Sequence, residues 1–163
     1  MTAIAASTPT AERSGPPPGT VAVGIGAFAA VELALAVFMA AAPHAFYTAV
    51  GPFGSFNGHY LRDVASFEGA IGIALLISLG RPSWRAPVLA LTTFQYALHS
   101  VNHLIDIDRG HPAWLGYLDF LSLAAATVVL AWLWREASRQ DAAHASGGEP
   151  AASHLPTAHG SVT

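Results

Sequence analysis

The segment YALHSVNHLIDID, residues 96–108, places two histidines, an asparagine and two aspartates at the end of an apolar run. His99 and His103 are four residues apart, a spacing that puts two imidazoles on one helical face, as in helical zinc motifs. Carboxylates from neighbouring helices complete comparable sites in bundle cores. We therefore take His99, His103, Asp106 and Asp63 as candidate ligands of a divalent transition metal.

These side chains belong to a polar stripe along one face of a predicted helix. At about 100° per residue, the polar residues between Thr92 and Asp106 fall mostly within an arc of about 100°. A strongly polar side chain at lipid depth costs a few kcal/mol or more, so the stripe is expected to face the interior of a bundle. Its members are Thr92, Gln95, His99, Asn102, His103 and Asp106.

The other apolar segments each contribute an acid at a similar depth. Glu32, Glu68 and Asp119 lie roughly 10–15 Å from the outer ends of their segments at about 1.5 Å per residue, which is the level of His99. A second tier of polar groups is expected nearer the outer surface. The sequence predicts a polar cavity in the outer half of the bundle, formed by Glu32, His59, Arg62, Glu68, Gln95, Asn102 and Asp119.

Four apolar segments must position these groups. Each is close to the roughly 20 residues that a helix needs to cross a bilayer core, and none alternates with a period of two, which excludes barrel strands. Short polar connections make sequential helices antiparallel. We therefore expect an all-α, four-transmembrane-helix, up-down-up-down bundle over residues 21–135. Its spans are predicted at about 21–42, 60–80, 86–107 and 112–134.

Composition supports a membrane protein and excludes several classes of function. Charged residues make up 10% of the 163 residues, against about 25% in soluble domains. The chain contains no cysteine, which excludes disulfides and thiolate chemistry. It also lacks a basic patch for nucleic acid. The Ala/Ser/Pro-rich ends, 1–20 and 136–163, are predicted to be disordered tails.

Arginine placement predicts the orientation, because cytoplasmic loops carry the excess of basic residues. Five arginines lie on one side of the predicted spans and two on the other, which places both termini in the cytoplasm of a cell-membrane protein. The first segment is longer than the roughly 7–15 apolar residues of a cleavable signal peptide, which favours an uncleaved span. The inner arginines are Arg13, Arg81, Arg85, Arg135 and Arg139, and the outer ones are Arg62 and Arg109.

The connection between the first two spans, residues 43–60, interleaves aromatic residues with glycine and proline. Aromatic side chains collect at membrane interfaces, so an interfacial anchor is the favoured interpretation. The alternative is a lid over the mouth of the bundle.

The polar groups allow a structural interpretation, in which buried hydrogen-bonded pairs lock the helices together, and three functional ones. We favour a binding or accessory subunit, working in the lipid bilayer with a partner membrane protein or as a homo-oligomer, over an enzyme. The enzyme alternative is a metal-dependent hydrolase or oxidoreductase with His99 and His103 as ligands and Glu68 or Asp119 as acid/base. Proton or small-solute transport is a further alternative. It would require an oligomer, because aliphatic residues seal the cytoplasmic half of the second and fourth spans.

The stretches GHYLRDVASFEGAIGIALL and ALHSVNHLIDID resemble a group of small, uncharacterised four-helix bacterial integral membrane proteins. The shared features are an Arg-Asp pair that opens the second span and an H-x-x-N-H stretch that closes the third. The matching residues are Arg62, Asp63, His99, Asn102 and His103. The resemblance implies the four-span architecture over residues 21–135 and no particular activity.

Overall fold

The computed structural model describes residues 19–147, and every regular element in this range is helical. The predicted all-α class is confirmed for these residues, while the predicted tails at 1–18 and 148–163 lie outside them. The elements are α1 (Thr20–Ala41), α2 (Pro43–Ala49), α3 (Gly58–Gly80), α4 (Pro82–Ile105), the 3₁₀ turn η1 (Ile107–Arg109) and α5 (Ala113–Gly147).

Local sequence signals account for the helix starts. Asn57 caps α3, because its side-chain oxygen accepts hydrogen bonds from the backbone N–H groups of His59 and Tyr60, both at 3.1 Å. Pro82 opens α4 rather than only ending α3, since the first helical position needs no N–H donor. The turn between these helices is therefore a single residue, Arg81, and α4 begins earlier than the predicted residue 86.

Three helices, α1, α3 and α5, are long and apolar enough to cross a membrane, with mean hydropathies of 2.3, 1.5 and 1.7 over their most apolar windows. Helix α4 has 24 residues, one more than α3, but it also contains the polar stripe. Among residues 19–147, three helices therefore indicate a membrane protein, and the sequence predicts four spans.

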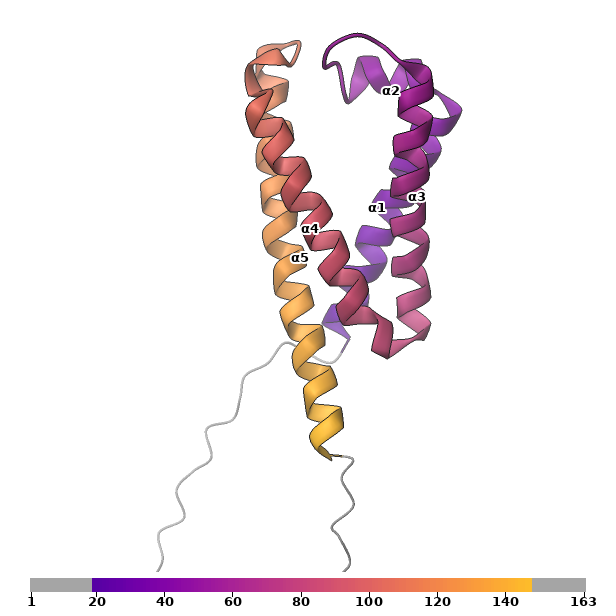
Figure 1. Ribbon diagram of the computed structural model, residues 1–163, viewed down its shortest axis with the longest axis vertical. Helices are drawn as coiled ribbons and strands as arrows, with labels where there is room; N and C mark the ends of the chain where they lie inside the picture. The colour runs from indigo at the N-terminus through magenta and orange to yellow at the C-terminus, as the bar shows by residue number, and fades with distance from the viewer. Residues whose placement is uncertain (1–18, 148–163) are drawn as a thin grey trace, which may run out of the picture.

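The helices form two antiparallel pairs, α1 with α3 and α4 with α5 (Figure 1). The pairs meet near the α3–α4 turn and diverge toward the end that holds α2 and η1 (Figure 1). Fully buried aliphatic side chains fill the narrow end, among them Ile25, Leu75 and Leu89. At this end the Arg85 guanidinium donates to the carbonyl oxygens of Ser78 and Leu79, which closes the last turn of α3.

Helix α5 corrects one predicted boundary. The sequence analysis ends the last span near residue 134 and begins a disordered tail at 136, whereas the helix continues to Gly147. Residues 135–147 are rich in good helix formers such as Ala, Arg, Glu and Gln. Glu136 and Arg139 form an ion pair one turn apart, and Ala137 is buried in the core. These contacts favour helix where composition alone predicted disorder.

Small residues bring α1 and α3 close together. A Cβ atom added at Gly72 would lie 2.8 Å from Leu33 Cγ and 3.1 Å from Glu32 Cβ, so this crossing requires glycine. Gly69 lies at the same interface, opposite Ala36. In α1 the residue in tight contact is Gly24, against Leu133, while a Cβ at Gly26 would meet no atom within 4 Å.

Candidate functional site

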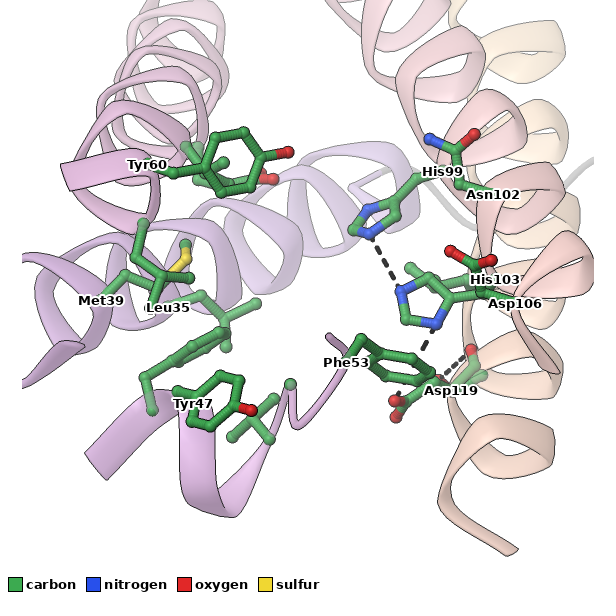
Figure 2. A pocket seen from close by; sticks show the side chains of 18 of the residues that line it. Leu35, Met39, Tyr47, Phe53, Tyr60, His99, Asn102, His103, Asp106 and Asp119 are labelled. Atoms are coloured by element: carbon green, nitrogen blue, oxygen red, sulfur yellow. Dashed lines mark hydrogen bonds and ion pairs between the residues drawn. The ribbon is translucent and has the colours of Figure 1, made fainter. Parts of the chain in front are cut away.

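The divergence of the two helix pairs creates a cavity of about 540 Å³ at the wide end of the molecule. Its walls come from different pairs and face each other in Figure 2, with Leu35, Met39 and Tyr60 on one side and His99 and Asp119 on the other. The first wall is mainly apolar and aromatic, whereas the second is polar. A volume of this size suits a small organic ligand, for which pockets of roughly 300–1,000 Å³ are usual.

The polar wall contains a connected row of three side chains (Figure 2). The Nε2 atoms of His99 and His103 are 3.2 Å apart, and His103 Nδ1 lies 3.9 Å from Asp119 Oδ2. In the hydrogen bond between the rings, one Nε2 carries a proton and the other accepts it. A proton on His103 Nδ1, facing the carboxylate, leaves His103 Nε2 as the acceptor for His99. The row therefore fixes ring orientation through Asp119.

The row is not fully satisfied. His103 Nδ1 and Asp119 Oδ2 are both buried from solvent, and neither has a hydrogen-bond partner, although they face each other. Buried polar atoms normally have a partner, so a ligand or water bridging them would complete the arrangement.

The floor of the cavity holds a second polar group of residues. Gln95 Nε2 donates a hydrogen bond of 3.3 Å to Glu68 Oε1, while Gln95 Oε1 is buried without a partner. Tyr96 also reaches the floor, where its ring packs edge-on against Phe28. Behind these residues lies Glu32, which is 0% exposed and has no hydrogen-bond partner on either carboxyl oxygen. Its carboxyl group is close enough to Glu68 and Tyr96 to interact electrostatically.

The segment after α2 reaches across the mouth of the cavity. The Phe53 ring packs edge-on against the His103 ring, with 5.0 Å between centroids, and so joins the α1–α3 side to α4. Tyr47 positions the segment, because its hydroxyl donates a 2.6 Å hydrogen bond to the carbonyl oxygen of Gly54. Gly54 has a φ of 65°, a left-handed conformation that favours glycine. This geometry fits the lid interpretation better than a simple interfacial anchor.

Most of the predicted site residues come together in this cavity. The polar stripe of α4 faces it, which agrees with the expectation that the two histidines turn toward the bundle interior. Residues from α3 and α5 face it as well. The predicted residues that line it are Glu68, Gln95, His99, Asn102, His103, Asp106 and Asp119.

The outer acids and bases of α3 lie elsewhere. Asp63 pairs with His59 at 3.5 Å, and both side chains are exposed. The Arg62 guanidinium donates to the Gly58 carbonyl oxygen of its own helix. Asp63 lies about 140° around the helix from Glu68, so only one of them can face the cavity. His59, Arg62 and Asp63 are therefore not cavity residues, and Glu32 lies behind the floor rather than in the lining.

The predicted metal site is not preformed. Residues 19–147 contain no group of three His, Asp or Glu side chains that could hold a metal ion. Asp63 lies outside the cavity, and Asp106 forms an ion pair with Arg109 at 3.2 Å. The Nε2 atoms of His99 and His103 lie within hydrogen-bond distance of each other.

Among the polar lining residues of α4 and α5, the sequence analysis missed Tyr96 and Ser122. Tyr96 lies nine residues from the end of α4 at Ile105 and is buried at the floor. Ser122 lines the cavity three residues after Asp119, a spacing that puts the two on one helical face. This spacing from Asp119 could have identified Ser122 as a lining residue from the sequence.

Comparison of this chain with family models, curated proteins and solved structures gives no match.

Proposed function

We propose that this protein is a multi-pass membrane protein with four spans, α1, α3, α4 and α5, whose outward-opening cavity binds a small molecule. The observation that supports binding is the cavity itself, since its lining combines apolar surface with a few convergent polar groups that lack partners. A role as binding or accessory subunit therefore fits better than a purely structural role for the polar residues.

The surface of α4 supports its assignment as the fourth span. Leu91, Phe94 and Leu98 are all more than half exposed, and their spacing places them on one face of the helix. An apolar face that stays more than half exposed among residues 19–147 suits contact with lipid, while the polar stripe faces the cavity. At about 1.5 Å per residue, 24 residues reach about 36 Å, which is enough to cross the hydrocarbon core.

The arginines support an orientation with the cavity facing outward and both termini in the cytoplasm. Arg81 and Arg85 lie at the narrow end of the molecule, at the α3–α4 turn. Arg135 and Arg139 belong to the second half of α5, which runs past the same end (Figure 1). Arg62, in the first turns of α3, and Arg109, after α4, lie toward the wide end. Because the basic residues concentrate at the narrow end, the positive-inside rule assigns that end to the cytoplasm.

The packing at the narrow end favours a binding site over a channel. Leu75, Leu89 and Leu130 are each 0% exposed and belong to one apolar core. This core closes the cavity toward the cytoplasmic end, so one copy of the chain provides a blind pocket rather than a path.

Cysteine labelling tests both the cavity and the orientation, because the chain itself contains no cysteine. In right-side-out membrane vesicles, a membrane-impermeant maleimide is expected to label Ser122→Cys, which lines the cavity. The neighbouring Leu121→Cys is the matched control: it has the same depth but a side chain turned outward to lipid, so labelling should be at least several-fold slower. Ser146→Cys, near the end of α5, should react only after the vesicles are permeabilised. Equal protection of Ser122→Cys and Leu121→Cys would contradict an outward-open cavity.

Removing the aromatic contact at the mouth should open the cavity further. In the Ser122→Cys background, Phe53→Ala is expected to increase the labelling rate several-fold, because Phe53 packs on His103 across the entrance. Phe56→Ala is the matched control, since Phe56 does not line the cavity and its ring does not contact His103; it packs on His44 and Tyr47 instead. An unchanged rate in Phe53→Ala would leave the segment as an interfacial anchor and not a lid.

A further inference from the structure

We infer that the cavity selects an organic cation with a bulky apolar body, an inference that rests on the proposed binding function. The charges of the lining point to a cation. Glu68, Asp106 and Asp119 line the cavity, whereas none of the described lining residues is an arginine and the chain contains no lysine. Asp106 forms an ion pair with Arg109, so Glu68 and Asp119 are the lining acids left without an arginine partner.

The floor strengthens this preference. Glu68 is 8% exposed and faces the cavity, and the fully buried carboxyl of Glu32 lies behind it. Within residues 19–147, no arginine forms an ion pair with either carboxyl group. Two buried acids without a cationic partner are costly, and a cation beside Glu68 would offset that cost. An anion would find no arginine or lysine among the described lining residues to balance its charge.

The opposite wall defines the rest of the ligand. Phe46, Tyr47 and Tyr60 present aromatic rings to the cavity, and Leu35 and Met39 add aliphatic surface. Aromatic faces attract organic cations through their quadrupole, while the apolar lining disfavours a small, strongly hydrated inorganic ion. A positively charged head near Glu68, with apolar substituents against this wall, satisfies both surfaces.

The shared chemistry is thus an ammonium- or phosphonium-type cation carrying apolar groups. A free solute and a lipid with an ammonium headgroup both have this chemistry.

Tetraphenylphosphonium and tetraphenylborate provide the test, because they match in size and shape and differ in the sign of their charge. Equilibrium dialysis of the purified full chain in a non-ionic detergent, corrected with empty micelles, is expected to show saturable binding of tetraphenylphosphonium. Tetraphenylborate should show only micelle partitioning. Equal saturable binding of both ions, or of neither, would overturn the inference.

Substitutions then locate the charge that matters. Glu68→Gln keeps the shape of the side chain and should weaken tetraphenylphosphonium binding about tenfold or more, as expected when a buried charge loses its partner. Asp63→Asn is the matched control: it removes the same charge from an exposed position on the same helix and should leave the dissociation constant unchanged. If Glu68→Gln does not fold, Tyr60→Leu, which removes an aromatic ring from the opposite wall, should weaken binding several-fold. An unchanged dissociation constant in every folded cavity variant would refute the cation site.

The outcomes separate this inference from the proposed function. If Ser122→Cys is labelled but the protein does not prefer the cation, the outward-open cavity stands and the inferred ligand class is refuted. If Ser122→Cys is protected from the maleimide, both the proposed binding function and the inferred ligand class are refuted. Where the cation does bind, adding phosphatidylethanolamine to the micelle distinguishes the sources, because displacement assigns a lipid ammonium and no displacement assigns a free solute.

Discussion

Replacing Glu32 with leucine is expected to stabilise the protein by about 1–3 kcal/mol, the range that protein mutations give for burying a polar group without a compensating hydrogen bond. Glu32 is fully buried in α1, and neither carboxyl oxygen has a hydrogen-bond partner. Its polar neighbours include a second carboxyl group, on Glu68. The folded state therefore bears a desolvation cost that leucine removes. Reversible unfolding in mixed micelles, followed by circular dichroism, measures the change.

Glu32→Gln is the matched control, since it has the same shape but keeps polar atoms in the same apolar surroundings. The free energy of unfolding of Glu32→Gln should therefore exceed that of the wild type by much less than that of Glu32→Leu does. A loss of more than about 1 kcal/mol in Glu32→Leu would show that the carboxyl group has a stabilising partner in the folded protein.

The same substitution links stability to binding. Because Glu32 adds negative charge behind Glu68, Glu32→Leu should bind tetraphenylphosphonium more weakly than the wild type while unfolding at a higher denaturant concentration. Opposite changes of this kind are expected where a residue is kept for function at the expense of stability. A stabilised variant with unchanged affinity would confine the cation site to Glu68 and the residues in front of it.

The sequence was sufficient to predict the polar face of α4 and much of the site. The spacing of Gln95, His99 and His103 determines that they share a face, whatever the rest of the fold. The cost of polar groups in lipid then predicts that this face points inward. Counting from the helix ends placed Glu68 and Asp119 at the correct depth, and both line the cavity.

Rotation about the helix axes could not be predicted, and the errors are concentrated there. Depth depends only on residue number, whereas rotation depends on which neighbour each helix meets. Helix α3 packs mainly against α1 through Gly69 and Gly72, and this packing turns His59, Arg62 and Asp63 away from the cavity. A sequence contains no direct signal for such a choice, because α3 has small, apolar and polar residues on several faces.

The arrangement of the helices in two pairs could not be predicted from the sequence either. A four-helix bundle of the expected type would bring all four helices together along their length. Here the pairs diverge toward one end (Figure 1), and the space between them becomes a cavity rather than a row of buried contacts. Bulky side chains such as Phe53 and Tyr60 line this space.

The largest loss of stability is expected from Gly116→Ala. A Cβ atom at this position would overlap the carbonyl oxygen of Ile107 and lie 2.9 Å from its carbonyl carbon. These are backbone atoms of η1, which cannot move aside as a flexible side chain can. Overpacking usually costs about 1–3 kcal/mol, and a clash with backbone is expected at or above the upper end of that range. Unfolding of the purified variant in mixed micelles provides the measurement.

Gly26→Ala is the matched control, because the same methyl group in the middle of α1 would meet no atom within 4 Å. Alanine has the higher helix propensity, so this variant should be neutral or more stable by up to about 1 kcal/mol. Equal stability of the two variants would show that η1 and α5 are not in close contact in the membrane.

The effect of Gly116→Ala should extend to the cavity, because the contact lies between the two halves of its polar wall. His103 precedes η1 by one turn, and Asp119 follows Gly116 by one turn on the same face of α5. Separating η1 from α5 therefore separates His103 from Asp119, which already lie 3.9 Å apart at the limit of an ion pair. A folded Gly116→Ala variant should bind tetraphenylphosphonium more weakly than the wild type, whereas Gly26→Ala should bind it equally well. Unchanged binding in a destabilised Gly116→Ala variant would mean that the cation depends on the floor of the cavity alone.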